Sequence, residues 1–120
     1  MKRLVLVAAM LAAGAVHAQD TALLQQGAAA FSYNCAPCHG DGGGKDGAAA
    51  LPGTFALGIK YKGAKPALLE KRTDLPAPVL KVFVRNGSFA MPPFRKTEVS
   101  DADIVAIAAY LQSTAKAGRP

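Results

Sequence analysis

Apolar residues follow helical spacing near both ends of the chain, and no segment alternates apolar and polar residues as a strand would. The first helical segment predicts a helix over residues 21–34, with Asp20 as its N-cap. Gly27 and Phe31 fall on the same face of this helix, because they are about one helical turn apart. The pattern therefore indicates an all-α fold.

A second strongly helical segment lies close to the C-terminus. Ser100 followed by Asp103 resembles a capping box with Asp in place of Glu, and it predicts a helix that runs to about Ala115. The inner face of this helix is expected to consist of Ile104, Ile107, Ala108, Tyr110 and Leu111.

Two shorter helices are expected in the middle of the chain, each with a proline at its start. One covers residues 66–72, and the other starts at Pro76 or Pro78 and runs through Arg85. The second is expected to be well buried, because its apolar residues lie on more than one side: Val79, Leu80, Val82, Phe83 and Val84. Residues 35–63 are rich in glycine and are expected to form an irregular loop. The expected architecture is about four helices with long irregular loops.

The N-terminus has the pattern of a secretory signal peptide. Basic residues at positions 2 and 3 precede an uncharged apolar run over residues 4–16, which is too short to span a bilayer as a helix. Small residues then precede a cleavage site after Ala18. We expect residues 1–18 to be the signal peptide and residues 19–120 to form one domain, exported to the periplasm without a membrane span.

Removal of the signal peptide changes the chemical inventory of the chain. The full sequence has 120 residues, a net charge of +6, two His, two Cys and three Met. Cleavage lowers the net charge by the two basic residues and leaves one histidine (His39), one methionine (Met91) and the pair Cys35 and Cys38. The remaining positive charge is modest and does not call for a nucleic-acid partner.

The first predicted helix is followed by a C-x-x-C-H motif, Cys35-Ala36-Pro37-Cys38-His39, which serves for covalent attachment of a c-type haem. Two thiols at this spacing can each add to a haem vinyl group, and the adjacent His39 is then held under the iron as the proximal ligand. A thioredoxin-like redox pair, a zinc site and a structural disulfide are the alternatives. Each explains less, because no βαβ pattern is visible, no further metal ligands remain, and a disulfide leaves His39 without a role.

The second axial ligand is predicted by elimination, since Met91 is the only thioether of the predicted mature chain. It lies in an irregular stretch over residues 87–97, where Pro92 favours an extended backbone at Met91 and Pro93 stiffens the loop. Lys, Tyr or water in the sixth position is the alternative. Iron held by His39 and Met91 is coordinatively saturated, which suits one-electron transfer.

The chain resembles the class I bacterial cytochromes c over nearly all of the predicted mature region. The resemblance implies the class I cytochrome c fold, wrapped around one covalently bound haem. It also implies that Gly27 and Phe31 on the first helix cross Tyr110 on the last. The Pro52 carbonyl is implied to accept a hydrogen bond from His39, as a ligating histidine usually donates its other nitrogen.

A second, shorter resemblance involves residues 83–87 and 90–94. They are similar to the cytochrome subunits of flavin-dependent phenol-oxidising dehydrogenases such as para-cresol dehydrogenase. This implies an alternative function, in which the chain is the cytochrome subunit of a flavoprotein dehydrogenase complex and accepts electrons from reduced flavin.

The expected function is periplasmic one-electron transfer by a carrier that is not itself an enzyme. Its expected partners are redox proteins, such as a flavoprotein dehydrogenase, a terminal oxidase or another cytochrome. Lys and Arg concentrate between residues 60 and 96, as a solvated face or as a docking face for an acidic partner. A haem sensor that binds a small ligand beside a labile Met91 is the remaining alternative.

Overall fold

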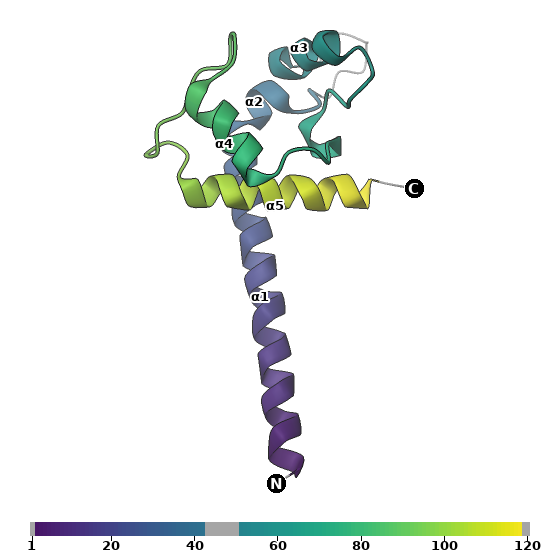
Figure 1. The fold of residues 1–120 in the computed structure, drawn as a ribbon, viewed down its shortest axis with the longest axis vertical. Coiled ribbons are helices and arrows are strands. Elements are labelled where there is room, and N and C mark those ends of the chain that lie inside the picture. The colour runs from purple at the N-terminus through teal and green to yellow at the C-terminus, as the bar shows by residue number, and fades with distance from the viewer. Residues whose placement is uncertain (1, 43–50, 119–120) are drawn as a thin grey trace.

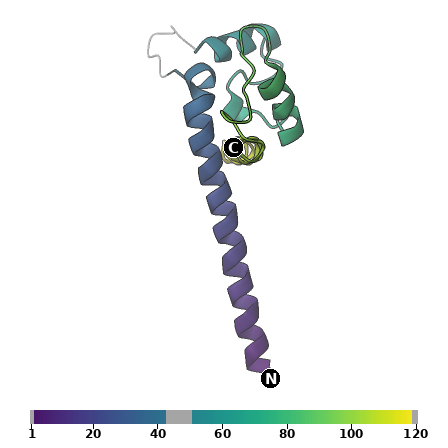
Figure 2. The ribbon, with the colours of Figure 1, turned by 90° about the vertical axis from the view of Figure 1, so that its left-hand side faces the viewer.

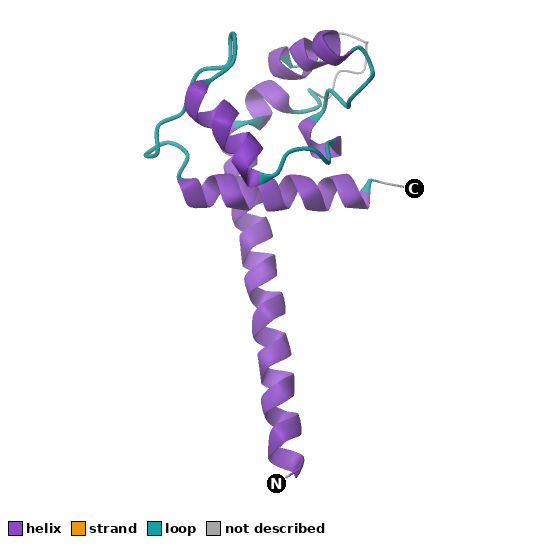
Figure 3. Cartoon of the chain, viewed as in Figure 1, coloured by secondary structure: helices purple, strands orange, loops and turns teal. Residues whose placement is uncertain are grey.

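The structure is a computed structural model that describes residues 2–42 and 51–118, with the backbone alone over residues 2–17 (Figure 1). In chain order, the elements are α1 (Lys2–Asn34), α2 (Ala36–His39), α3 (Pro52–Tyr61), the 3₁₀ turn η1 (Leu69–Lys71), α4 (Ala77–Asn86) and α5 (Asp101–Ala117). Figure 3 shows helices and loops, with no strand, in the described part of the chain. The expected all-α fold is confirmed.

Helices α1 and α5 cross, and α2, α3 and α4 lie on one side of α5 (Figure 1). A Cβ on Gly27 of α1 would lie 2.6 Å from the carbonyl carbon of Ala106 and 2.9 Å from Cβ of Tyr110, so only glycine allows this close approach. The ring of Phe31 packs against that of Tyr110, with the ring centroids 5.5 Å apart. The expected contact of Gly27 and Phe31 with Tyr110 is confirmed.

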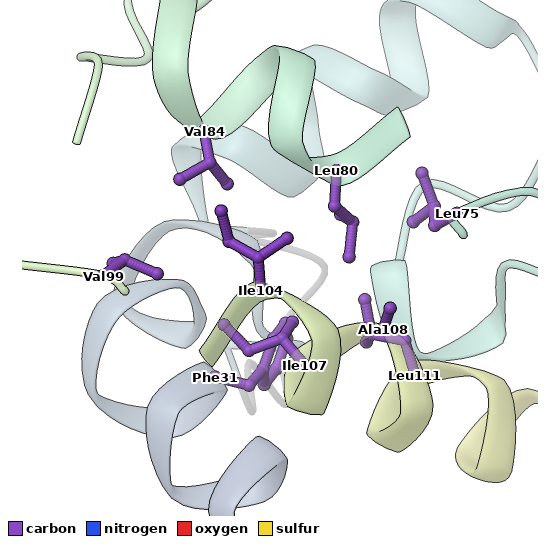
Figure 4. Close-up of a cluster of buried hydrophobic side chains, with 9 residues drawn as sticks. All are labelled: Phe31, Leu75, Leu80, Val84, Val99, Ile104, Ile107, Ala108 and Leu111. Carbon is purple, nitrogen blue, oxygen red and sulfur yellow. The ribbon is translucent and has the colours of Figure 1, made fainter. Parts of the chain in front are cut away.

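The hydrophobic core lies along the inner face of α5, against α1 and α4 (Figure 4). Its buried members are Phe31, Leu75, Leu80, Val84, Val99, Ile104, Ile107, Ala108 and Leu111. Tyr110 lies at the edge of this cluster, where its hydroxyl donates to the Glu70 carboxylate at 2.6 Å and links α5 to η1. The expected inner face of the last helix is confirmed.

Local signals set the start of α5 and the end of α4. The Asp103 N–H donates to Ser100 Oγ at 3.0 Å and the Ser100 N–H donates to the Asp103 carboxylate at 3.0 Å, so the capping box is confirmed. Helix α4 follows Pro76 and ends at Gly87, whose φ of 70° reverses the chain as glycine does most readily.

Helix α1 is longer than the sequence pattern predicts. It is continuous from Lys2 to Asn34, so Asp20 lies inside it and is not its N-cap. The reason is that strong helix formers, chiefly Ala and Leu, precede Asp20. The N-terminal part of α1 extends away from the other helices in both views (Figures 1 and 2). No helix within the described ranges is long and apolar enough to cross a membrane.

Two elements in the middle of the chain also differ from expectation. Helix α3 lies inside the glycine-rich segment expected to be irregular, because Pro52 occupies its first turn and pre-sets the helical φ. The helix expected over residues 66–72 shortens to η1. Leu68 is extended there, with φ −74° and ψ 122°, and the chain turns so that Leu69 packs against the core.

Candidate functional site

The two cysteines lie on one helical turn directly after α1. Cys35 is the N-cap of α2, and the N–H groups of Cys38 and His39 donate to its carbonyl at 3.1 and 2.8 Å. Both thiols are free, and Cys38 is exposed. Burial, and then the neighbouring Cys38, raise the pKa of Cys35 to about 11. Residues three apart on a helical turn lie on the same side, which is the arrangement that attachment at two points needs.

His39 ends α2, and its ring packs against the backbone of α3. A Cβ on Gly53 would lie 2.7 Å from His39 Cε1 and 2.8 Å from Nδ1. Nδ1 is buried and has no hydrogen-bond partner among the described residues. Burial also lowers the pKa of this ring, so His39 is neutral at neutral pH. A neutral imidazole is the form that ligates a metal.

The first turn of α3 is hydrogen-bonded to the residue that follows His39. The Thr54 hydroxyl donates to the Gly40 carbonyl at 2.8 Å in a buried contact. Because His39 Nδ1 makes no hydrogen bond here, the role of Pro52 as its acceptor stays a prediction. Sequence reasoning missed Gly53, the residue that does touch the ring, and its position after Pro52 was the signal that could have found it.

Helix α4 is only half buried, contrary to expectation. Leu80 and Val84 pack in the core, but the other apolar side of the helix is exposed. The exposed apolar residues of α4 are Val79, Val82 and Phe83, and those of α3 are Phe55 and Ile59. Both helices lie on the side of α5 that carries α2 (Figure 1). Each of these helices therefore exposes apolar side chains that the protein core does not cover.

Met91 lies on a tight turn that follows α4. The Ser88 N–H donates to the Met91 carbonyl at 3.0 Å, and the Met91 N–H donates to the Ser88 carbonyl at 2.9 Å. Phe89, at the tip of the turn, is fully exposed and has a φ of 52°. A Cβ on Gly87 would lie 2.5 Å from the Met91 carbonyl oxygen, so the turn folds closely on itself.

The residues at this site fit a covalently attached haem. The structure brings Cys35, the N-cap of α2, together with Cys38 and His39 on α2, and both thiols are free. Met91 lies on a separate turn beyond α4, and Pro52 begins α3. No cluster of three His, Cys, Asp or Glu side chains suited to a metal ion occurs in the described ranges.

Comparisons with known proteins identify the family. The family model described as "Cytochrome C oxidase, cbb3-type, subunit III" matches residues 22–111. The chain is 38% identical over 91 residues to "Cytochrome c6" of Anabaena variabilis, and the alignment covers 76% of this chain and 91% of that protein. No solved structure matches the chain. This chain belongs to the class I c-type cytochromes.

Family membership decides between the interpretations of the C-x-x-C-H motif. The chain binds haem c covalently, with the motif at Cys35 and Cys38 as the attachment pattern, and it functions in electron transfer. The predicted haem cofactor is therefore confirmed, and the redox-pair, zinc and structural-disulfide alternatives are set aside.

Proposed function

We propose that this cytochrome is a periplasmic one-electron carrier whose haem iron is ligated by His39 and Met91. When bound, the haem supplies the one-electron redox chemistry of its iron. Cys35 and Cys38 hold it by covalent bonds, and His39 stands on the same turn. The observation that carries this proposal is that two free thiols and the His39 imidazole stand together on the single turn α2.

Met91 and the exposed apolar side chains tune this chemistry. A thioether ligand raises the reduction potential relative to a second histidine, and a rigid turn keeps it in place. Apolar side chains exclude water and disfavour the additional charge of the ferric state. The residues proposed to do this are Phe55, Ile59, Val79, Val82 and Phe83.

Absorption spectra of the purified protein test both ligands. We expect a haem c spectrum in the reduced protein and, in the oxidised protein, the weak red charge-transfer band of thioether-ligated ferric haem. Met91→Ala is expected to abolish the red band and keep the haem attached. A wild-type protein without that band contradicts Met91 ligation, and a protein without any haem spectrum contradicts the whole site assignment.

The periplasmic location rests on the signal-peptide pattern of residues 1–18. N-terminal sequencing of the protein recovered from the periplasmic fraction is expected to begin at Gln19. A chain that retains Met1 in the membrane fraction contradicts the proposed cleavage.

A second candidate is the cytochrome subunit of a flavoprotein dehydrogenase complex. It is favoured by Phe89, a fully exposed apolar side chain close in sequence to Met91, because large exposed aromatic residues are typical of protein interfaces. Purification from native extracts distinguishes the two candidates. A stoichiometric flavoprotein that copurifies with this chain supports the subunit, and a monomer in every extract contradicts it.

A further inference from the structure

A backbone hydrogen bond joins the segment after Met91 to the C-terminal end of α4. Pro92 and Pro93 have no N–H, so Phe94 supplies the first backbone donor beyond Met91. Its N–H donates to the Val84 carbonyl at 2.7 Å. Since the turn before Met91 is closed by its own pair of hydrogen bonds, Met91 is held from both sides.

Arg85 adds a side-chain tie to this same segment. Its Nη1 donates to the Phe94 carbonyl at 3.1 Å, while Nη2 donates to the Val99 carbonyl at 2.8 Å and to the Asp101 carboxylate at 2.6 Å. The side chain is only 17% exposed. One guanidinium therefore joins both ends of the loop over residues 94–99 to α4, and it joins α4 to the first residue of α5.

Lys81 provides a comparison on the same helix. It also pairs with Asp101, at 2.9 Å, but its side chain is 51% exposed. Ion pairs that face solvent contribute little to stability, whereas hydrogen bonds from a buried charged group contribute more. The Arg85 Nε atom is buried and has no hydrogen-bond partner in the described structure. The hydrogen bonds of Arg85 are therefore those of its two Nη groups, which reach backbone acceptors on the loop.

We propose that Arg85 is a positioning residue that keeps the Met91 thioether at the haem iron. This inference rests on the proposed ligation by Met91. Without the guanidinium, residues 94–99 lose their side-chain hydrogen bonds to α4. The Phe94–Val84 backbone hydrogen bond then remains as the bond to α4 on the C-terminal side of Met91. The ligand loop then opens more often, while the helices remain folded.

Arg85→Gln tests this, with Lys81→Gln as the matched control, because each change removes one charge from α4 and one partner of Asp101. Carbon monoxide binds the reduced haem only while the sixth position is open, so its initial binding rate at neutral pH measures loop opening. We expect Arg85→Gln to bind it about tenfold faster than wild type, and Lys81→Gln to stay within about twofold. In Arg85→Gln alone, urea should abolish the red band before it abolishes helical circular dichroism.

Equal carbon monoxide rates in the two folded variants overturn the inference. If Arg85→Gln does not fold, Asp101→Asn takes its place, since it keeps Arg85 and both carbonyl acceptors but weakens the tie at α5. Its rate should rise about threefold, and a rate equal to that of Lys81→Gln overturns the inference. A wild-type protein that lacks the red band contradicts Met91 ligation itself, so the two failures are distinguishable.

Discussion

Gly53 touches two parts of the haem-attachment turn, the ring of His39 and the carbonyl of Cys38. A Cβ at this position would lie 2.8 Å from both His39 Nδ1 and the Cys38 oxygen. Neither group can move without disturbing the turn that carries the thiols. We expect Gly53→Ala to lower the free energy of unfolding of the haem-loaded protein by about 1–3 kcal/mol and to alter its ferric spectrum. Urea unfolding and absorption spectra check this.

Gly58 is the matched control on the same helix. A Cβ there meets only Cβ of Ala67, at 3.7 Å, which is an ordinary contact. Gly58→Ala is therefore expected to raise the free energy of unfolding by up to ~1 kcal/mol, because alanine favours the helix. If Gly53→Ala were as stable as Gly58→Ala, with the wild-type spectrum, α3 would not confine His39.

Phe89 has a strained backbone conformation that no side-chain burial offsets. Its φ is 52° and its side chain is fully exposed. Because asparagine adopts positive φ more readily, Phe89→Asn is expected to raise the free energy of unfolding by about 0.5–1 kcal/mol. Phe89→Ala keeps the strain and should bring no gain. Thermal unfolding of both variants checks this, and equal midpoints would count against strain at this turn.

Among the elements, α5 could be predicted from sequence because its signals are local. Ser100 and Asp103 form the capping box, and the one-sided apolar pattern lies within the helix itself. Helix α3 has one local signal, Pro52 in its first turn, but it lies in a glycine-rich segment that indicates a loop. The contacts that hold it, Gly53 against His39 and Thr54 to Gly40, join residues that are distant in sequence.

The site could be predicted only in part for a similar reason. The C-x-x-C-H motif indicates haem attachment at Cys35 and Cys38, because that chemistry depends on closely spaced residues, whereas ligation by His39 stays a prediction. The burial of α4 was predicted wrongly, because an apolar residue such as Val82, which is 57% exposed, does not reveal whether protein or cofactor covers it. The tie from Arg85 to residues 94–99 is likewise a tertiary contact.

Tyr110 joins α5 to η1, and this contact has a pH signature. The hydrogen bond to Glu70, together with burial, raises the pKa of Tyr110 to about 12. An unfolded tyrosine has a pKa of about 10, so the contact stabilises the folded state fully below pH ~10 and is lost as the pH rises to ~12. The wild-type protein should therefore lose more stability over this range than Tyr110→Phe. Urea midpoints of both proteins check this, and parallel profiles would contradict it.

Across the whole molecule, positive charge is neutralised unevenly. Asp74 pairs with Lys65 and Arg72, and Asp101 pairs with Lys81 and Arg85. By contrast, Lys60, Lys62 and Lys71 make no ion pair with a described residue. These three lysines are spread from the last turn of α3 to the last residue of η1. An anionic partner that docks on this segment would therefore meet lysines whose positive charge is not paired with a carboxylate of the described residues.

Oxidation of the reduced protein by ferricyanide, an anion, tests this steering. The rate is expected to fall as salt rises above ~0.1 M, where screening acts over about 10 Å. Lys60→Gln with Lys62→Gln should flatten the salt dependence, and Lys116→Gln at the far end of α5 is the control. A rate that does not change with ionic strength would contradict electrostatic steering, and these lysines would then form an ordinary solvated face.

The hydrophobic core leaves apolar side chains of α3 and α4 uncovered. The buried cluster lies along one face of α5, whereas α3 packs on α2 and leaves Phe55 and Ile59 exposed. Helix α4 likewise has one apolar side in the core and one outside it. A domain of this size buries a limited share of its surface, so we expect a bound haem that covers these side chains to contribute a large part of its stability.

The haem-free chain should therefore fold poorly. The double variant Cys35→Ser/Cys38→Ser cannot attach haem, and we expect it to have less helix than wild type and to melt without a sharp transition. Met91→Ala keeps both attachment thiols and is the control, so its melt should remain cooperative. Far-UV circular dichroism on heating compares the two. A sharp melt of the haem-free variant at wild-type helix content would mean that the cluster around α5 is sufficient to fold the chain.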